Sequence, residues 1–339
     1  MLVTSPISAG SLDGPLGTLV TLALALIVDR TLGEPPARIH PVVWIGATTN
    51  RLLRFAPRSG AARQLLFGGA IALGVTLLSG WLVWLLFSCA VPAAIAAVGA
   101  PSATSPGGGA LALLDLAARA WVLKTLFAVS ALGDAARAVR DALARHDLRA
   151  ARDGLASLCS RDPAEFDEEA LAAATIESVA ENASDSIVAP LLCFLVLGLP
   201  ATACYRAINT LDAMIGYRGR FEHLGKVTAR LDDLANLIPA RVTALLLLAG
   251  GALTGADARS GWRVLRRDAG RTPSPNAGWP MAAMAGLLGV ALEKAGHYRL
   301  GDARAPLRPE KIDSAWRIVQ LAIAVGLALA AAVLGALAL

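Results

Sequence analysis

Long uncharged runs of apolar residues most constrain what this chain can fold into. Ile318–Leu339 carries no charge and is long enough to cross roughly 30 Å of hydrocarbon as a helix. Gly14–Val28 is shorter, but neither Lys nor Arg precedes it, which favours a retained first helix over a signal peptide. With 55% hydrophobic and 17% charged residues, the chain is too apolar for a water-soluble domain of 339 residues. The sequence predicts an integral membrane protein.

Further apolar runs differ in quality. Leu65–Ala100 and Ile187–Ala203 are uncharged, whereas Ala110–Leu132 and Leu237–Leu253 contain charges and another stretch after Pro280 is short. Backbone at membrane depth can break where it lines a hydrated cavity. The plausible break points are Gly198, Pro200, Pro239 and Pro280. We expect an all-α, polytopic protein with broken or re-entrant segments and about four to six crossings.

The net charge of +5 indicates topology rather than nucleic-acid binding, because the arginines are scattered and lack interleaved aromatics. Arginines from Arg30 to Arg63 place the loop after the first helix in the cytoplasm. Residues 133–174 show charges around apolar positions at helical spacing, which predicts a cytoplasmic, extramembrane pair of amphipathic helices with a break near residues 160–163. Otherwise we expect residues 1–339 to form one membrane-embedded domain. The four cysteines show no CxxC spacing, so neither a disulfide framework nor a zinc site is expected.

Polar residues concentrate in one part of this apolar chain, between Thr175 and Arg241. In TIESVAENASDS, Glu177, Glu181 and Asp185 lie at i, i+4 and i+8, along one stripe of a helix, with Asn182 beside them. Like charges at this spacing repel, and a hard cation such as Mg²⁺ or a bound ammonium would offset the repulsion. A solvated helix face is the alternative.

Two further clusters follow. In YRAINTLDAMIGYR, Arg206, Asn209 and Asp212 fall on one helical side, which suits either a buried salt bridge or phosphate binding. The segment ARLDDLANLIPAR has a DDxxN pattern of the kind that holds Mg²⁺ against a phosphate chain, with arginine forks on both sides; a charge cluster at a helix end is the alternative. Its residues are Arg230, Asp232, Asp233, Asn236 and Arg241.

A stiff segment, TPSPNAGWP, presents Ser274 and Asn276 between prolines. Taken alone it is more simply an ordinary turn before the next apolar helix.

Five segments together resemble the CobD/CbiB family of cobalamin biosynthesis, in the family's order and over nearly the whole chain. They are DRTLGEPPARIHPVVWIG (29–46), TIESVAENASDSIVAPL (175–191), YRAINTLDAMIGYR (205–218), ARLDDLANLIPARVTAL (229–245) and SPNAGWPMAAMAGLLGV (274–290). The chain departs from the family's usual residues at Glu34, which stands in place of Asp, and at Thr272, where His often precedes SPN.

The resemblance implies a membrane enzyme, adenosylcobinamide-phosphate synthase. Such an enzyme joins aminopropanol or its phosphate to the remaining propionate carboxyl of adenosylcobyric acid, with ATP and Mg²⁺ as the implied means of activation. It would lie in the cell inner membrane, in contact with lipid, with its active site facing the cytoplasm. Association with other enzymes of the pathway is a further expectation.

The clusters and the resemblance together suggest roles for individual residues. Five carboxylates would hold Mg²⁺ and nucleotide charge: Glu177, Glu181, Asp185, Asp232 and Asp233, of which all but Glu177 are candidate metal ligands. Arg206, Arg230 and Arg241 would hold phosphate, and Asn182, Asn209, Asn236, Ser274 and Asn276 would orient substrates. Asp212, Asp29, Glu34 and His40 complete the predicted substrate site. A carboxylate would accept the proton of the attacking amine.

Two other functions remain open at this level. A membrane prenyl-type transferase would use the DDxxN and ENxxD motifs to bind Mg²⁺-diphosphate and would need no ATP. A non-catalytic, AmpE-like sensory membrane protein would bind neither nucleotide nor corrinoid.

Overall fold

The protein is mostly helical and divides into two compact units. The computed structural model describes residues 14–97, 106–159, 162–217, 219, 221–294 and 296–338. One unit, here unit 1, comprises residues 1–128, 190–232 and 330–339, and unit 2 comprises residues 129–189 and 233–329. The chain therefore passes between the units four times, and each unit is described by itself. That all 339 residues act as one membrane-embedded domain stays a prediction.

Within the described residues, four helical segments are long and apolar enough to cross a membrane. They are Pro15–Leu32, Ala61–Ala94, Glu168–Ile215 and Pro309–Leu337. A fifth would be the pair Lys226–Ala235 and Leu237–Leu253, which is bent at a short break. This confirms a multi-pass, helical membrane protein; re-entrant segments and the cytoplasmic placement of residues 133–174 stay predictions.

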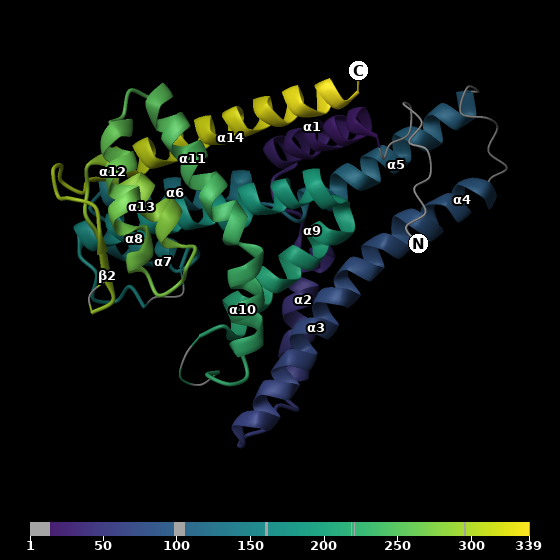
Figure 1. Ribbon diagram of the computed structural model, residues 1–339, viewed down its shortest axis with the longest axis horizontal. Helices are drawn as coiled ribbons and strands as arrows, with labels where there is room; N and C mark the ends of the chain where they lie inside the picture. The colour runs from purple at the N-terminus through teal and green to yellow at the C-terminus, as the bar shows by residue number, and fades with distance from the viewer. Residues whose placement is uncertain are drawn as a thin grey trace. The chain divides into compact units, whose positions relative to one another are not determined.

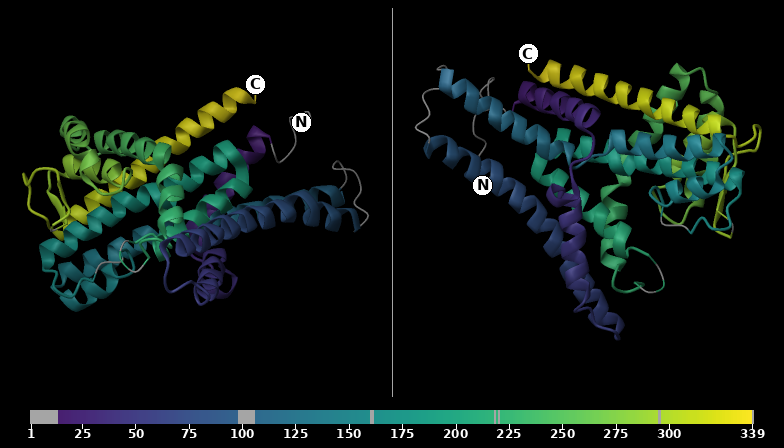
Figure 2. Two further views of the ribbon diagram at one scale, coloured as in Figure 1. Left: turned by 60° about the horizontal axis from the view of Figure 1, so that its bottom comes forward. Right: turned by 180° about the vertical axis from the view of Figure 1, so that it is seen from behind.

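Unit 1 contains the helices of the first third of the chain together with α9. Its elements are α1 (Pro15–Leu32), η1 (Ala37–Ile39), α2 (Pro41–Leu53), α3 (Ala61–Leu85), η2 (Leu86–Ala90), α4 (Val91–Ala97), α5 (Pro106–Lys124) and α9 (Ala189–Ile215), with most of α10 (Lys226–Ala235). The π-helical η2 joins α3 to α4 in one long rod (Figures 1 and 2). A small apolar core of Ile45, Ile71, Val75, Ala207 and Leu211 holds α2, α3 and α9 together.

One expected break, at Gly198, is visible in the apolar segments. Gly198 has φ +81°, a conformation that glycine adopts without a Cβ clash, and it breaks α9 just before Pro200. Pro239 lies in the first turn of α11, where a missing N–H costs no helical hydrogen bond. The predicted break at Gly198 is confirmed, whereas the bend near Pro239 lies before it, between Ala235 and Leu237.

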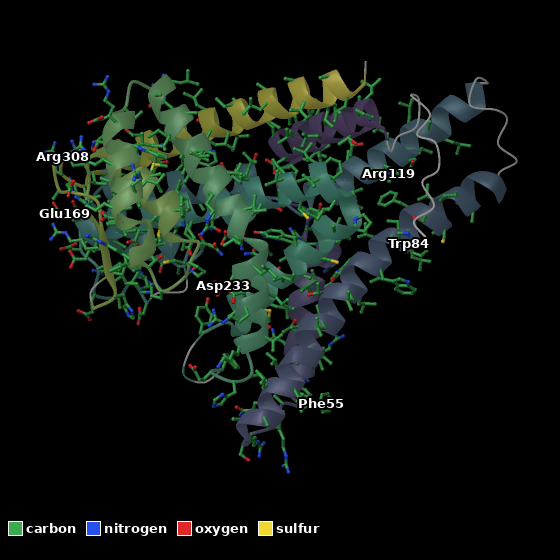
Figure 3. The ribbon with its side chains drawn as sticks, in the orientation of Figure 1. Phe55, Trp84, Arg119, Glu169, Asp233 and Arg308 are labelled. Carbon is green, nitrogen blue, oxygen red and sulfur yellow. The ribbon has the colours of Figure 1, made fainter. Side chains whose placement is uncertain are left out.

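The charges of α5 are accommodated by pairing. Arg119, labelled in Figure 3, lies 3.1 Å from the carboxylate of Asp115 one turn earlier, and its guanidinium lies 5.1 Å from the ring centroid of Phe87. Lys124, at the end of the same helix, is fully buried. These charges explain why the run Ala110–Leu132 is less cleanly apolar than the others, since each is compensated inside the fold.

Unit 2 is a helical bundle with a small hairpin. Its elements are α6 (Val129–Ala144), α7 (Leu148–Leu155), α8 (Glu168–Asn182), η3 (Ala183–Val188), α11 (Leu237–Leu253), α12 (Ala258–Asp268), η4 (Ala269–Arg271), α13 (Gly278–Leu288), β1 (Leu292–Lys294), β2 (Tyr298–Leu300) and the first part of α14 (Pro309–Leu337). The antiparallel strands pair Leu292 with Leu300 and Lys294 with Tyr298. Helices α6 and α7 cover much of the segment predicted as an amphipathic pair. The expected break at residues 160–163 falls partly outside the described residues.

Helix α13 forms the centre of unit 2. It is apolar on all sides, and ten of its eleven residues are buried. It packs against α11, α12 and α8, as Figure 1 shows. A helix this short cannot span a bilayer, so the apolar stretch after Pro280 is core rather than a crossing.

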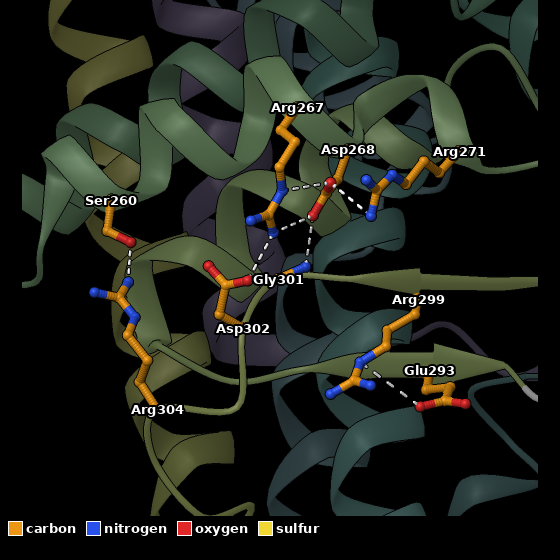
Figure 4. A network of polar contacts seen from close by, with 9 residues as sticks. All are labelled: Ser260, Arg267, Asp268, Arg271, Glu293, Arg299, Gly301, Asp302 and Arg304. Atoms are coloured by element: carbon orange, nitrogen blue, oxygen red, sulfur yellow. Dashed lines mark hydrogen bonds and ion pairs between the residues drawn. The ribbon is translucent and has the colours of Figure 1, made fainter.

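A buried carboxylate ties α12 to the hairpin. Asp268 has no exposed side chain, and it accepts hydrogen bonds from Arg267 (2.8 Å) and from the backbone N–H of Gly301 (2.8 Å) while Arg271 lies 3.0 Å away (Figure 4). Burial alone would raise the pKa of Asp268, but these donors and charges hold it below its usual value. The carboxylate is therefore ionised and fully compensated.

The four cysteines are free, as expected.

Candidate functional site

The predicted site residues fall in both units. Unit 2 holds Glu177, Glu181, Asn182, Asp185, Asp233, Asn236, Arg241, Ser274 and Asn276, and unit 1 holds Asp29, Glu34, His40, Arg206, Asn209, Asp212, Arg230 and Asp232. The boundary between the two units thus falls inside the DDxxN motif, between Asp232 and Asp233. Each group is built up within its own unit.

The acidic segment of unit 2 starts from a well-capped helix. Asp167 accepts the N–H of Ala170 at the start of α8, and Glu168 and Glu169 complement the positive end of the helix. Further along, Glu177 is only 2% exposed, and its Oε2 accepts a long hydrogen bond from the Tyr298 hydroxyl (3.4 Å). A buried carboxyl group is costly unless it has a hydrogen-bond partner, and the Tyr298 hydroxyl is such a partner for Glu177.

The helix changes its winding within the motif. Residues Ala183–Val188 form the π-helix η3, whose wider turn means that Asp185 does not follow Glu181 by one α-helical turn. The expected continuous stripe of three carboxylates therefore holds for Glu177 and Glu181 and is altered at Asp185. Asn182 is fixed by bonds to its own helix, donating to Ser178 O (2.9 Å) and accepting from Ser186 Oγ (3.1 Å). Single π-turns of this kind often occur at functional sites.

Two motifs far apart in sequence meet through Asn276. Its amide nitrogen donates to the backbone carbonyl of Asp233 (2.7 Å), and its Oδ1 accepts from Arg241 Nη1 (2.9 Å). Ser274 Oγ accepts the backbone N–H groups of Asn276 and Ala277, which fixes the turn. The segment that sequence alone reads as an ordinary turn thus lies against the DDxxN motif.

Arg241 is held on three sides. Its Nη1 donates to Asn276 and to the Leu237 carbonyl (2.6 Å), and its guanidinium lies 4.5 Å from the ring centroid of Trp279. Figure 3 labels the neighbouring Asp233 on α10. Because η3 and α13 both pack against α11, three of the five motif segments are assembled in unit 2.

Unit 1 contains a buried ionic cluster at the ends of α1 and α5. Lys124 Nζ lies 2.9 Å from Asp29 Oδ1 and donates to Glu34 Oε1 (2.8 Å). Lys124 is fully buried and Asp29 is 2% exposed, while the Glu34 side chain is 35% exposed. Glu34 therefore links the buried pair to the surface.

His40 completes this cluster. Its Nδ1 accepts the N–H of Val42 and caps α2, so the other ring nitrogen carries the proton and donates to Glu34 Oε2 (3.0 Å). Burial would raise the pKa of Glu34, but the bonds and charges of His40 and Lys124 lower it overall. The side chain of Glu34 thus reaches both a buried ammonium and a half-buried histidine.

The remaining predicted residues of unit 1 lie on α9 and α10. Arg206 donates to Asn209 Oδ1 (3.3 Å), which confirms that these two lie on one helical side. Asp212 and Asp232 are half-buried and Arg230 is exposed. Their roles stay predictions.

The predicted metal site also stays a prediction. Within the described residues, no three or more His, Cys, Asp or Glu side chains converge on one metal position. The donor set still fits Mg²⁺ chemically, since that ion prefers oxygen ligands and is commonly bound by one or two carboxylates plus water and substrate phosphates. Glu181, Asp185, Asp232 and Asp233 supply such oxygens.

Sequence reasoning missed two residues. Lys124 was visible as a charge inside an apolar run, and its long side chain beside the acidic Asp29–Glu34 segment was the signal that could have found it. Tyr298 gave no such signal, because a three-residue strand carries no readable pattern and its contact with Glu177 spans 121 positions.

The family profile of the CobD/CbiB protein matches residues 22–322. The chain belongs to the CobD/CbiB family. A cobalamin biosynthesis protein CobD of Dehalococcoides mccartyi is 38% identical over 87% of this chain and 90% of its own length. That of Chromobacterium violaceum is 39% identical over 84% of each chain, and that of Brucella anthropi is 36% identical over 94% and 98%. No solved structure matches this member of the family.

Replacement of Lys124 tests whether the buried cluster holds unit 1 together. In Lys124→Met, two carboxylates lose their shared cation, and we expect a loss of about 3–5 kcal/mol in stability. Thermal unfolding in detergent measures it. The matched change Lys226→Met, at an exposed position, should shift stability by no more than about 0.5 kcal/mol. Equal melting of Lys124→Met and the wild type would contradict the account.

Proposed function

We propose that the protein forms the amide bond between the remaining propionate carboxyl of adenosylcobyric acid and aminopropanol or its phosphate. The product would be adenosylcobinamide or its phosphate, in cobalamin biosynthesis. Membership of the CobD/CbiB family over residues 22–322 carries this proposal. The relatives' names as cobalamin biosynthesis proteins support a corrinoid substrate. In class, the enzyme is an ATP-dependent amide ligase.

The chemistry requires activation, because a carboxylate and an amine do not condense readily in water. Phosphoryl transfer from ATP to the carboxylate would give an acyl phosphate and ADP. The amine nitrogen then attacks the carbonyl carbon, the carbon–oxygen bond to the phosphoryl group breaks, and phosphate leaves with one former carboxylate oxygen and with the proton that the nitrogen loses as the amide forms. The ammonium group of the amine first loses a proton to a carboxylate of the site.

The residues of this chain would bind and orient the reactants. Mg²⁺, when bound by Glu181, Asp185, Asp232 and Asp233, would neutralise phosphate charge. Arg206, Arg230 and Arg241 would grip phosphate oxygens, and Glu177 would add to the charge of the site. The polar residues Asn182, Asn209, Asn236, Ser274 and Asn276 would orient the substrates, with Asp29, Glu34, His40 and Asp212 forming further parts of the site.

The geometry of Arg241 favours phosphate binding. Among the described residues, its Nη1 donates hydrogen bonds to Leu237 O and Asn276 Oδ1. A guanidinium has five N–H donors, so Nε and Nη2 retain three in a fixed plane. Contact with Trp279 keeps that plane in place. A preorganised fork of this kind suits a bidentate contact with a phosphate group.

Location follows from the substrates. ATP is supplied in the cytoplasm, which supports a site on the cytoplasmic side of the inner membrane. The positive-inside rule, applied to the basic loop between Arg30 and Arg63, supports the same side. The apolar helices would contact lipid. Enzymes that make the corrinoid acid or use its amide are the expected further partners.

An assay of the purified full-length protein tests the function. With adenosylcobyric acid, Mg²⁺, ATP and each amine in turn, we expect a corrinoid mass increase corresponding to amide formation and one ADP per product. Asp232→Ala and Asp233→Ala should abolish product. Asp134→Ala, at a side chain 73% exposed on α6, should retain activity.

Other outcomes of this assay distinguish the alternatives. No change in corrinoid mass with either amine would overturn the proposal. Transfer from an isoprenoid diphosphate without ATP would favour a prenyl-type transferase, and binding of neither nucleotide nor corrinoid would favour an AmpE-like sensor.

Replacement of Arg241 tests the phosphate fork separately. Arg241→Lys keeps the charge but loses the planar donors, so we expect the KM for ATP to rise about tenfold or more with a smaller effect on kcat. Steady-state kinetics at varied ATP measure both. Arg299→Lys, at a side chain 60% exposed on β2, is the matched control. An unchanged KM would remove Arg241 from the nucleotide site.

A further inference from the structure

Within the described residues of unit 2, helix α12 has one buried face and one exposed face. Its inward face, including Ser260, Gly261, Val264 and Leu265, is buried, and α12 packs against α13 and α11. Its outward face carries Arg259, Trp262, Arg263 and Arg266 at i, i+3, i+4 and i+7, which is one continuous stripe of a helix. All four are exposed, and Trp262 is 48% exposed. We propose that this stripe binds the anionic headgroups of membrane phospholipids.

The arginines of α12 and η4 are divided between structure and surface. Arg267 and Arg271 are engaged by Asp268, as Figure 4 shows. For Arg259, Arg263 and Arg266, no hydrogen bond or ion pair is recorded with any part of the chain that the structure describes. The positive charges of the three outward arginines are therefore available to a partner outside the described part of the chain.

One carboxylate faces the stripe from the start of the helix. Asp257 caps α12 by accepting the Ser260 N–H (2.9 Å), and Arg304 lies 3.6 Å from it. The bond from Ser260, and then the charges of Arg304 and Arg263, hold the pKa of Asp257 below its usual value. This carboxylate is already shared with Arg304, so the stripe keeps a net positive charge.

Contacts of the preceding helix bring the start of α12 close to the polar end of a candidate span. Gly250 of α11 packs against α14 so closely that a Cβ there would lie 2.6 Å from Ile318 O and 2.7 Å from Ala322 N. Ile318 is where the uncharged run of α14 begins, directly after Arg317. The end of α11 therefore lies at the polar end of a candidate span.

The connection to α12 is short. Four residues, Thr254–Asp257, join α11 to α12 and can cover at most about 14 Å when extended. The start of α12 thus lies within headgroup reach of the level at which α14 becomes apolar. Tryptophan is enriched at this depth, and arginine clusters there attract anionic lipid.

A headgroup layer fits this surface better than a nucleotide does. Small-molecule sites enclose most of their ligand, whereas the stripe is the convex outer face of one helix. Attraction of each arginine to an anionic surface corresponds to about fivefold in lipid preference, weakened by salt. The inference does not depend on the proposed catalytic activity.

Quenching of Trp262 by brominated lipid tests this surface. Full-length protein is placed in nanodiscs of phosphatidylcholine and phosphatidylglycerol at a fixed ratio, with bromine on the acyl chains of one lipid or the other. The Trp262 signal is the wild-type emission minus that of Trp262→Phe. We expect stronger quenching by brominated phosphatidylglycerol than by brominated phosphatidylcholine at equal mole fraction and low salt, with the difference reduced at high salt.

Variants separate charge from bulk membrane contact. The triple change Arg259→Gln, Arg263→Gln and Arg266→Gln should remove the preference, about fivefold for each arginine, and the corresponding lysine variant should keep it. The matched triple Arg145→Gln, Arg149→Gln and Arg299→Gln changes exposed arginines of the same unit and should leave it intact. Equal quenching by the two lipids would overturn the proposal, as would loss of the preference on adding Mg²⁺-ATP, which would identify a nucleotide as the occupant.

Discussion

Burying an ionised side chain among apolar helices is costly, and the structure meets this cost by exact pairing. In unit 1, the fully buried ammonium of Lys124 lies between Asp29 and Glu34. Without the lysine, the two acids at the end of α1 would repel each other in apolar surroundings; without the acids, α5 could not end in a buried charge. The packing of α1 against α5 depends on this balance.

In unit 2, arginines compensate the buried charge. Asp268 is buried under Arg267, Arg271 and the backbone of Gly301, and this anchors α12 to the hairpin. On α11, Arg241 is fixed by Asn276, a backbone carbonyl and Trp279. One group of arginines thus stabilises the fold, whereas Arg241 has further N–H donors, which the proposed function assigns to a phosphate group. The membrane-facing arginines of α12 form a third group with an external partner.

The sequence predicted the helical membrane class because uncharged runs such as Ile318–Leu339 leave little alternative. It also singled out Arg241, Asn276 and Asp233, which the structure brings together across 43 positions. It could not predict the π-turn at Ala183, because helical spacing assumes regular winding. Nor could periodicity reveal that the segment after Pro280 is buried core, since an all-apolar helix reads alike in a core and in a membrane.

The function rests on chemistry that leaves an isotopic record. If ATP activates the corrinoid carboxylate as an acyl phosphate, one carboxylate oxygen must depart with the phosphate when the amide forms. The most direct measurement supplies adenosylcobyric acid labelled with ¹⁸O in that carboxyl, together with ATP and the amine, and analyses the phosphate by mass spectrometry. The account predicts one ¹⁸O in each inorganic phosphate released. Amide formation with unlabelled phosphate, or with the label in AMP, would contradict it.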